Sequence, residues 1–304
     1  MPRGAALKMA SCFSAAEWVA IHSAQPGWHN FSQGYQDSVL MSLWNKGLIG
    51  HKRGGTYVEF GFHLKDVTGT AHQPPMPRPL NSPRHLTPRE LPSYGANSEI
   101  LARNGWSGIR MDGDESAAQA IPNLHLEFIT VETIVALFRK YGVNQDVDYV
   151  SIDIDSCDLW VFLALTDVYQ PRLISIEYNS LYAFNDSRTN ICSRPQDVRR
   201  DFFGRKQYGQ FYSTALHGHW LDGVSLKAIH LAAQRRGYTV IWVETHLDVF
   251  LARSDLLCPE TGVALDTFAA DTGMATHTTK SIHAPRGSVN EQEELRRKWT
   301  VEYV

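Results

Sequence analysis

The chain has 304 residues, of which 43% are hydrophobic and 20% are charged, a composition typical of one large globular domain with appendages. Its net charge of -3 excludes the strongly basic surface expected of a nucleic-acid-binding protein. No run of about 18 apolar residues occurs, so the sequence predicts no transmembrane segment.

The cysteines and the first residues bear on localisation. The four cysteines are Cys12, Cys157, Cys192 and Cys258. They lie far apart with neither metal-ligand spacing nor a paired framework, which favours a reducing compartment. Arg3 and Lys8 precede the first acid, Glu17, so the N-terminus weakly resembles an organellar transit peptide. We therefore expect an intracellular protein, either cytoplasmic or organellar.

From Thr56 onward, short β-branched or apolar runs alternate with helical patterns, which predicts βαβ units and a parallel sheet. The predicted strands are 56–61, 107–112, 124–130, 148–155 and 172–179. The predicted helices are 97–106, 131–142 and 159–168, with a further helix at 225–237 that begins at Ser225 and ends at Gly237.

The last two predicted strands, 238–244 and 247–255, are too close together for a parallel crossover and must form an antiparallel hairpin. A parallel sheet that ends in a helix and such a hairpin is the arrangement of class I methyltransferases. We expect an α/β, Rossmann-like class I sheet of seven mostly parallel strands with helices on both faces.

Three regions are predicted along the chain. Residues 1–50 form an N-terminal helical segment, and 51–256 form the main domain. The main domain contains an insertion at 70–96 with seven of the chain's 14 prolines, which predicts an extended loop. Residues 257–304 form an irregular tail with a short charged helix in "EQEELRRKW".

The stretch "YVSIDIDSCDLWVF" places Asp153 and Asp155 at the carboxyl end of a predicted core strand, with Asp158 shortly after. Acids in such places can simply end a strand or cap the next helix. They can also be functional, because ligands in open α/β sheets bind beyond the carboxyl ends of the parallel strands.

Several pieces together resemble the FkbM-like S-adenosylmethionine (SAM)-dependent methyltransferases. They are "SQGYQD", "YVEFG", "NSEILARNGWSGIRMDGD", "YVSIDIDSCDLWVF", "RLISIEYNS" and "GVSLKAIHLAAQRRGYTVIWVETHLDVFLARSDLL". They occur in the family's order and cover roughly residues 32 to 256. The resemblance implies the seven-stranded class I fold, SAM as cofactor and a small-molecule methyl acceptor.

The resemblance also implies cofactor-binding residues. Glu59, Phe60 and Gly61 would line the methionine end of the pocket, with Asn97 at the start of the next helix. Asp112 would accept hydrogen bonds from the ribose hydroxyls, with Asp114 as the alternative acid and a simple turn as the alternative role. The adenine would lie near Phe128, Ile129 and Thr130.

Two roles are open for the acids after the fourth strand. Asp153 or Asp155 could act as general base toward an attacking hydroxyl. Alternatively, Asp153, Asp155, Glu177 and Asn179 could form an all-oxygen Mg²⁺ site that orients that hydroxyl. His217 and His219 of "ALHGHWLDG" are further candidate bases, unless this stretch is an ordinary surface loop.

The sequence departs from the family pattern after Gly61, where bulky Phe62, His63 and Leu64 replace small residues. Two hypotheses therefore follow. One is an active methyltransferase, most simply an O-methyltransferase, with the proline-rich loop as a lid. The other is a catalytically inactive, methyltransferase-like structural or assembly subunit that binds protein partners through 70–96 and the C-terminal tail.

Overall fold

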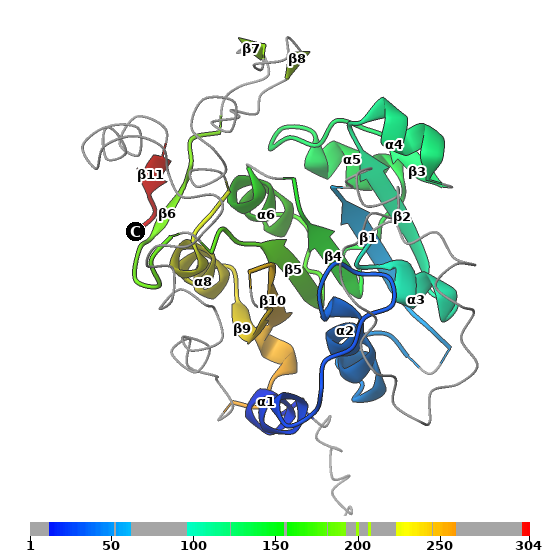
Figure 1. Ribbon diagram of the computed structural model, residues 1–304, viewed down its shortest axis with the longest axis vertical. Coiled ribbons are helices and arrows are strands. Elements are labelled where there is room, and N and C mark those ends of the chain that lie inside the picture. The colour runs from blue at the N-terminus through cyan, green and yellow to red at the C-terminus, as the bar shows by residue number, and fades with distance from the viewer. Residues whose placement is uncertain are drawn as a thin grey trace, which may run out of the picture.

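The structure is a computed structural model of the chain (Figure 1). It describes residues 12–51, 53–61, 96–121, 123–154, 157–180, 182–192, 199–200, 206–207, 223–244, 246–259 and 300–304. Four sequence predictions lie wholly or almost wholly outside these ranges: the 70–96 insertion, Asp155, the pair His217 and His219, and the charged helix near the C-terminus.

A seven-stranded sheet with the order β3-β2-β1-β4-β5-β10-β9 forms the centre of the protein (Figure 1). Its strands are β1 (Thr56–Phe60), β2 (Ser107–Asp112), β3 (Leu124–Leu126), β4 (Tyr149–Ile152), β5 (Leu173–Glu177), β9 (Tyr238–Val243) and β10 (Asp248–Arg253). The first five are parallel to one another, and β10 is antiparallel to both of its neighbours. The predicted α/β, Rossmann-like fold with a C-terminal antiparallel hairpin is confirmed.

The helices agree with the sequence pattern, apart from one that the pattern did not indicate. They are α1 (Ala15–Ser23), α2 (Gln36–Asn45), α3 (Glu99–Arg103), α4 (Glu115–Ala120), α5 (Ile134–Lys140), α6 (Asp158–Thr166) and α8 (Leu226–Arg235). The short, alanine-rich α4 has no apolar periodicity and was not predicted. Ser225 caps α8 as expected, because its hydroxyl accepts a hydrogen bond of 3.3 Å from the N–H of Ala228.

Smaller elements lie outside the central sheet. Strands β6 (Arg188–Asn190) and β11 (Thr300–Glu302) pair with each other, as do β7 (Arg199–Arg200) and β8 (Lys206–Gln207). A 3-10 helix, η3 (Ser254–Leu256), follows β10. None of the described helices is long and apolar enough to cross a membrane.

The two faces of the central sheet differ in chemistry. One face is apolar, and the helix α6 packs on β4 and β5 with α5 and α8 on either side. Its central residues are Val58, Phe60, Val150, Ile152, Ile174 and Ile176. The other face carries Glu59, Arg110, Ser151 and Ser175 in one row across four strands. This polar row is buried, so its hydrogen-bonding groups need partners within the protein.

Helices α1, α2 and α3 cover the polar face, and residues at the starts of α2 and α3 supply those partners. Gln36 at the start of α2 and Asn97 just before α3 both donate to Asp248 on β10. The helix α1 is attached by aromatic contact, since the rings of Trp18 and Trp242 meet edge to face at 5.8 Å.

All four cysteines are paired, so the interpretation of unpaired cysteines was wrong. Cys12 bonds to Cys258 across 246 residues of sequence, and Cys157 bonds to Cys192 across 35. Their spacing gave no sign of this because the fold, and not the sequence, brings the partners together. The cysteines therefore no longer favour a reducing compartment, since disulfides are rare in cytosolic proteins.

Candidate functional site

The carboxyl ends of the parallel strands lie at one edge of the sheet, which we call the carboxyl edge. Asp112 ends β2, Asp153 directly follows β4, and Glu177 ends β5. The turn between β9 and β10 reaches the same edge, because Asp248 is the register partner of Glu177. This edge is where an open α/β sheet binds ligands, and it carries the candidate site.

Glu59 belongs to the buried framework beneath this edge. Its carboxylate accepts hydrogen bonds from the N–H of Asn97 (2.6 Å), the N–H of Ser98 (2.9 Å) and the Ser98 hydroxyl. Burial raises the pKa of the Glu59 carboxyl, and the nearby Arg110 and these hydrogen bonds offset part of the rise. Glu59 therefore fixes the start of α3 on the sheet.

Arg110 extends the framework from β2. Its guanidinium makes an ion pair of 2.7 Å with Glu99 in the first turn of α3 and lies over the ring of Tyr57. Its Nε donates to the Ser98 hydroxyl at 3.2 Å. Glu59 in β1 and Glu99 in α3 thus belong to one buried cluster of charges around Arg110.

Gly61 marks a close approach between two strand ends at this edge. Its φ is +94°, and a Cβ placed on it would lie 1.2 Å from the carbonyl oxygen of Asp153. Only glycine fits there, because the ends of β1 and β4 meet backbone to backbone. Phe60 next to it is fully buried, so any contact of Phe60 with a ligand would use its backbone.

Asn97 connects three elements through its side-chain amide. The Nδ2 group donates to Asp248 at 2.9 Å and to the Ser151 hydroxyl at 3.2 Å. Gln36 Nε2 donates to the same Asp248 oxygen at 3.0 Å, and Gln36 Oε1 accepts from the N–H of Gly34 at 2.7 Å. The buried Asn97 side chain thus links the start of α3 to β4 and β10. Its predicted role in cofactor binding stays a prediction.

Gln36 and Asp248 were not identified from the sequence as residues of this region. The only available signal was the stretch "SQGYQD", whose Asp37 carboxylate accepts the backbone N–H groups of Asn30, Phe31 and Ser32 at 2.6, 2.8 and 3.5 Å. These hydrogen bonds fold the loop before α2, and the loop in turn positions Gln36 to bind Asp248.

Replacing Asp248 with asparagine is expected to reduce the loss of stability as the pH rises from the acidic range. Burial raises the pKa of the Asp248 carboxyl, while hydrogen bonds from Gln36 and Asn97 oppose the rise. An acid with a raised pKa contributes fully below its unfolded pKa, and the contribution is lost as the pH rises through the folded value. The amide oxygen of asparagine can accept the same two hydrogen bonds without a charge.

The free energy of unfolding of Asp248→Asn relative to that of the wild type, measured with urea between about pH 4 and pH 8, should therefore increase as the pH rises. Asp146→Asn, on an exposed residue at the opposite edge, should show no such trend. A constant difference between Asp248→Asn and the wild type across this range would contradict the argument.

The turn after β2 combines a carboxylate with an exposed aromatic ring. Asp112 Oδ1 accepts the N–H of Asp114 at 2.6 Å, which fixes the turn through Gly113. The ring of Phe128 lies against Gly113, since a Cβ there would be 2.8 Å from Cδ2 of Phe128. Phe128 is 37% exposed, so its ring borders the carboxyl edge and is open to a ligand.

Residues next to this turn stabilise the backbone around the starts of α4 and α5. Asp114 caps α4, because its carboxylate accepts the N–H of Ala117 at 3.1 Å. Thr130 and Thr133 stabilise the turn that precedes α5 through reciprocal bonds between hydroxyl and backbone N–H of 2.8 and 3.2 Å. Ile129 and Thr130 are buried, so Phe128 is the accessible side chain among the three residues predicted to approach adenine.

The two described acids after β4 differ in exposure: Asp158 is buried, whereas Asp153 is partly exposed at the carboxyl edge. Asp158 is buried at the start of α6 and accepts the N–H of Ile154 at 2.7 Å, so it closes the turn that follows β4. Asp153 is partly exposed and donates its backbone N–H to Phe60 at 3.3 Å.

The proposed Mg²⁺ ligands are only partly described. Glu177 lies one row beyond the Ile152 and Ile176 pair, next to Asp153. Asn179 follows it and donates its backbone N–H to Val224 at 2.8 Å. Within the described ranges, which omit Asp155, no group of three His, Cys, Asp or Glu residues is arranged to hold a metal ion.

His246, in the turn between β9 and β10, is an accessible residue at this edge that sequence reasoning missed. It has a left-handed backbone with φ of 63°, rare for a residue with a side chain and often found at functional sites. Its N–H donates to the Tyr178 hydroxyl, and its Nδ1 lies 3.0 Å from the Ser180 hydroxyl. No periodic pattern covers this turn, so only its position in the fold reveals it.

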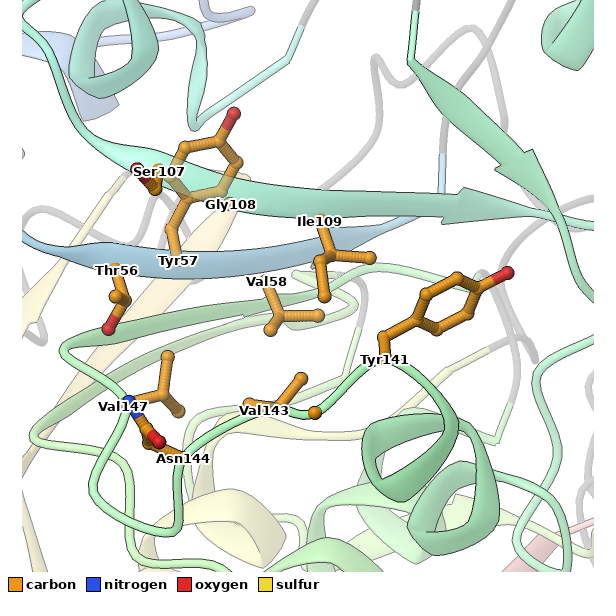
Figure 2. A pocket seen from close by; sticks show the side chains of 11 residues that line it. Thr56, Tyr57, Val58, Ser107, Gly108, Ile109, Tyr141, Val143, Asn144 and Val147 are labelled. Atoms are coloured by element: carbon orange, nitrogen blue, oxygen red, sulfur yellow. The ribbon is translucent and has the colours of Figure 1, made fainter.

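A cavity of about 220 Å³ lies at the other edge of the sheet. Figure 2 shows Val58 and Ile109 from β1 and β2 facing Val143 and Val147 from the loop after α5, with Tyr141 beside them. This lining is largely apolar, and the cavity is remote from the acids of the carboxyl edge. We therefore place the candidate site at the carboxyl edge and not in this cavity.

The sequence matches no protein-family model and no curated protein. The fold and the residues of the carboxyl edge are therefore the features that bear on function.

Proposed function

We propose that this protein is a SAM-dependent methyltransferase of the FkbM-like type that transfers a methyl group to a hydroxyl of a small molecule. The order of the seven strands, with β10 reversed between β5 and β9, supports the proposal. This is the arrangement typical of class I methyltransferases, in which the cofactor lies across the carboxyl ends of the first strands.

The observation that carries the proposal is the pairing of Asp112 with Phe128 across Gly113. A carboxylate at the end of the second strand suits the two neighbouring hydroxyls of a ribose, which it can accept as hydrogen-bond donors. An exposed aromatic ring beside it suits the face or edge of an adenine. Gly113 keeps the space between the two clear of a side chain.

The described residues support the proposal more directly at the adenosine end of the site than at the methionine end. Glu59 and Asn97 are engaged by the start of α3, whereas Asp112 and Phe128 border the accessible edge. The cofactor, when bound, would supply an electrophilic methyl group beside the end of β4. His246 joins Asp153, Asp155, His217 and His219 as a proposed base for the acceptor hydroxyl.

Calorimetric titration with SAM and with S-adenosylhomocysteine tests the proposal. Micromolar affinity, about -8 kcal/mol, is expected for the wild type. Asp112→Asn should weaken binding by roughly 10- to 100-fold, because a hydrogen bond to a charged group contributes about 1.5 to 3 kcal/mol. The matched control Asp146→Asn, which removes the same charge at the opposite edge, should bind like the wild type.

Two further results of the titration are informative. An increase in affinity on addition of Mg²⁺ would support the proposed oxygen site of Asp153, Asp155, Glu177 and Asn179. Absence of binding at millimolar ligand, with the protein folded, would overturn the proposal. It would favour the catalytically inactive structural subunit, whose proposed partner-binding arms are 70–96 and the C-terminal tail.

A further inference from the structure

The disulfide between Cys157 and Cys192 lies at the carboxyl edge, beside the candidate site. Cys157 is the N-cap of α6 and lies four residues after Asp153. Its carbonyl accepts the N–H of Val161 at 2.9 Å, which is the first hydrogen bond of the helix. The bond between Ile154 and Asp158 spans the same turn, so the disulfide joins the turn that carries Asp153.

The other half of this disulfide belongs to a segment with its own anchor. Cys192 follows β6, and the N–H of Arg188 in β6 donates to the Ser225 hydroxyl at 2.9 Å, while the N–H of Ser225 donates to the Arg188 carbonyl at 2.8 Å. Trp160 of α6 donates its indole N–H to the carbonyl of Asn190 at 2.8 Å. The disulfide thus fastens the first turn of α6 to a strand fixed at the start of α8.

The second disulfide offers a control within the same molecule. Cys258 follows η3, after the carboxyl end of β10, and its N–H donates to the Phe13 carbonyl at 2.9 Å. Because β10 is antiparallel to β5, this bond lies at the edge opposite the candidate site. Both bonds constrain the chain, but only Cys157–Cys192 is placed at the carboxyl edge.

We propose that Cys157 and Cys192 are positioning residues for the candidate site, whose geometry depends on their disulfide. A dithiol reductant would break the S–S bond, supply two electrons and two protons, and be oxidised to its own disulfide. The resulting thiols would no longer hold the turn after β4 against the segment after β6. The affinity of the site for its ligand would then fall while the central sheet stays folded.

The test compares two paired variants, Cys157→Ser with Cys192→Ser, and Cys12→Ser with Cys258→Ser. Amide hydrogen exchange at Ile154 and Val161 should accelerate by about tenfold or more in the first pair, because local opening becomes easier. In the second pair, exchange at these two amides should stay within a few-fold of the wild type under conditions where each variant is folded. Equal acceleration in both pairs, or none in the first, would overturn the proposal.

Titration with S-adenosylhomocysteine gives the functional readout and rests on the proposed function. Weaker binding in the first pair alone supports the positioning role, and unchanged binding overturns it. If the wild type itself fails to bind, the proposed function fails, while the exchange comparison still decides the positioning role. If the first pair does not fold, the same amides are followed in the wild-type protein before and after dithiothreitol opens this bond, as identified by mass spectrometry of alkylated peptides.

Discussion

Gly61→Ala is expected to destabilise the protein by roughly 2 to 5 kcal/mol, the sum of left-handed backbone strain and a backbone collision. The new Cβ would lie 1.2 Å from the carbonyl oxygen of Asp153 and would overlap it. Gly61 directly follows β1, and Asp153 directly follows β4. No side-chain rotation relieves this contact, so β1 or β4 must shift. Urea denaturation of the two proteins measures the loss.

Gly105→Ala separates the two causes. Gly105 has nearly the same backbone, with φ of +86°, but a Cβ there meets nothing within 4 Å. Its replacement should cost about 1 kcal/mol from strain alone. If Gly61→Ala costs no more than Gly105→Ala, the ends of β1 and β4 can separate freely, and the close approach has no energetic importance.

Loss of the disulfide between Cys12 and Cys258 has the second large expected effect. Closing a loop across 246 residues corresponds to roughly 5 kcal/mol in the chain-entropy description. The same relation gives roughly 4 kcal/mol for the 35 residues between Cys157 and Cys192. Cys12→Ser with Cys258→Ser should therefore lower the free energy of unfolding more than Cys157→Ser with Cys192→Ser.

Chemical denaturation of the two paired variants under identical conditions compares these losses. The reversed ranking would show that the Cys12–Cys258 disulfide does not stabilise the protein mainly by restricting the unfolded chain. In that case the N-terminal helix α1 detaches alone when its bond is removed, and the remainder of the sheet keeps its stability. The fluorescence of Trp18, which contacts Trp242, would report that detachment.

The central strands and main helices were predictable because each is local in sequence. The run around Val150 and Ile152 is apolar enough for a buried strand, and the closely spaced segments before and after His246 allow only a hairpin. Helix α8 has an N-cap serine and a terminal glycine at the expected positions. Short elements such as α4 carry no periodic signal and could not be found in this way.

The buried framework was not predictable, because its contacts join distant residues. Gln36 meets Asp248 across 212 positions, and Cys12 meets Cys258 across 246. Glu59 was predicted to line a ligand pocket because, in the family that the sequence resembles, the cofactor lies across the carboxyl ends of the first strands. That position also lies beneath α3. The sequence alone does not distinguish an acid that faces a ligand from one that accepts hydrogen bonds from backbone N–H groups at the start of a helix.

The accessible part of the candidate site was partly predictable. Asp112 ends β2 and Phe128 lies shortly after β3, and because these neighbouring strands are parallel, both residues lie at one edge. His246 was missed, since a histidine in a turn has no pattern to mark it. Its backbone conformation and its contacts with Tyr178 and Ser180 depend on two strands that come together only in the fold.

The place of β10 has a consequence for how the chain folds during synthesis. It lies between β5 and β9, and its first residue, Asp248, receives hydrogen bonds from Gln36 and Asn97. While the ribosome has not yet released this strand, those amides have no buried acceptor, and β5 presents an unpaired edge. We expect the nascent protein to stay incompletely folded and accessible to chaperones until Arg253, the last residue of β10, has emerged.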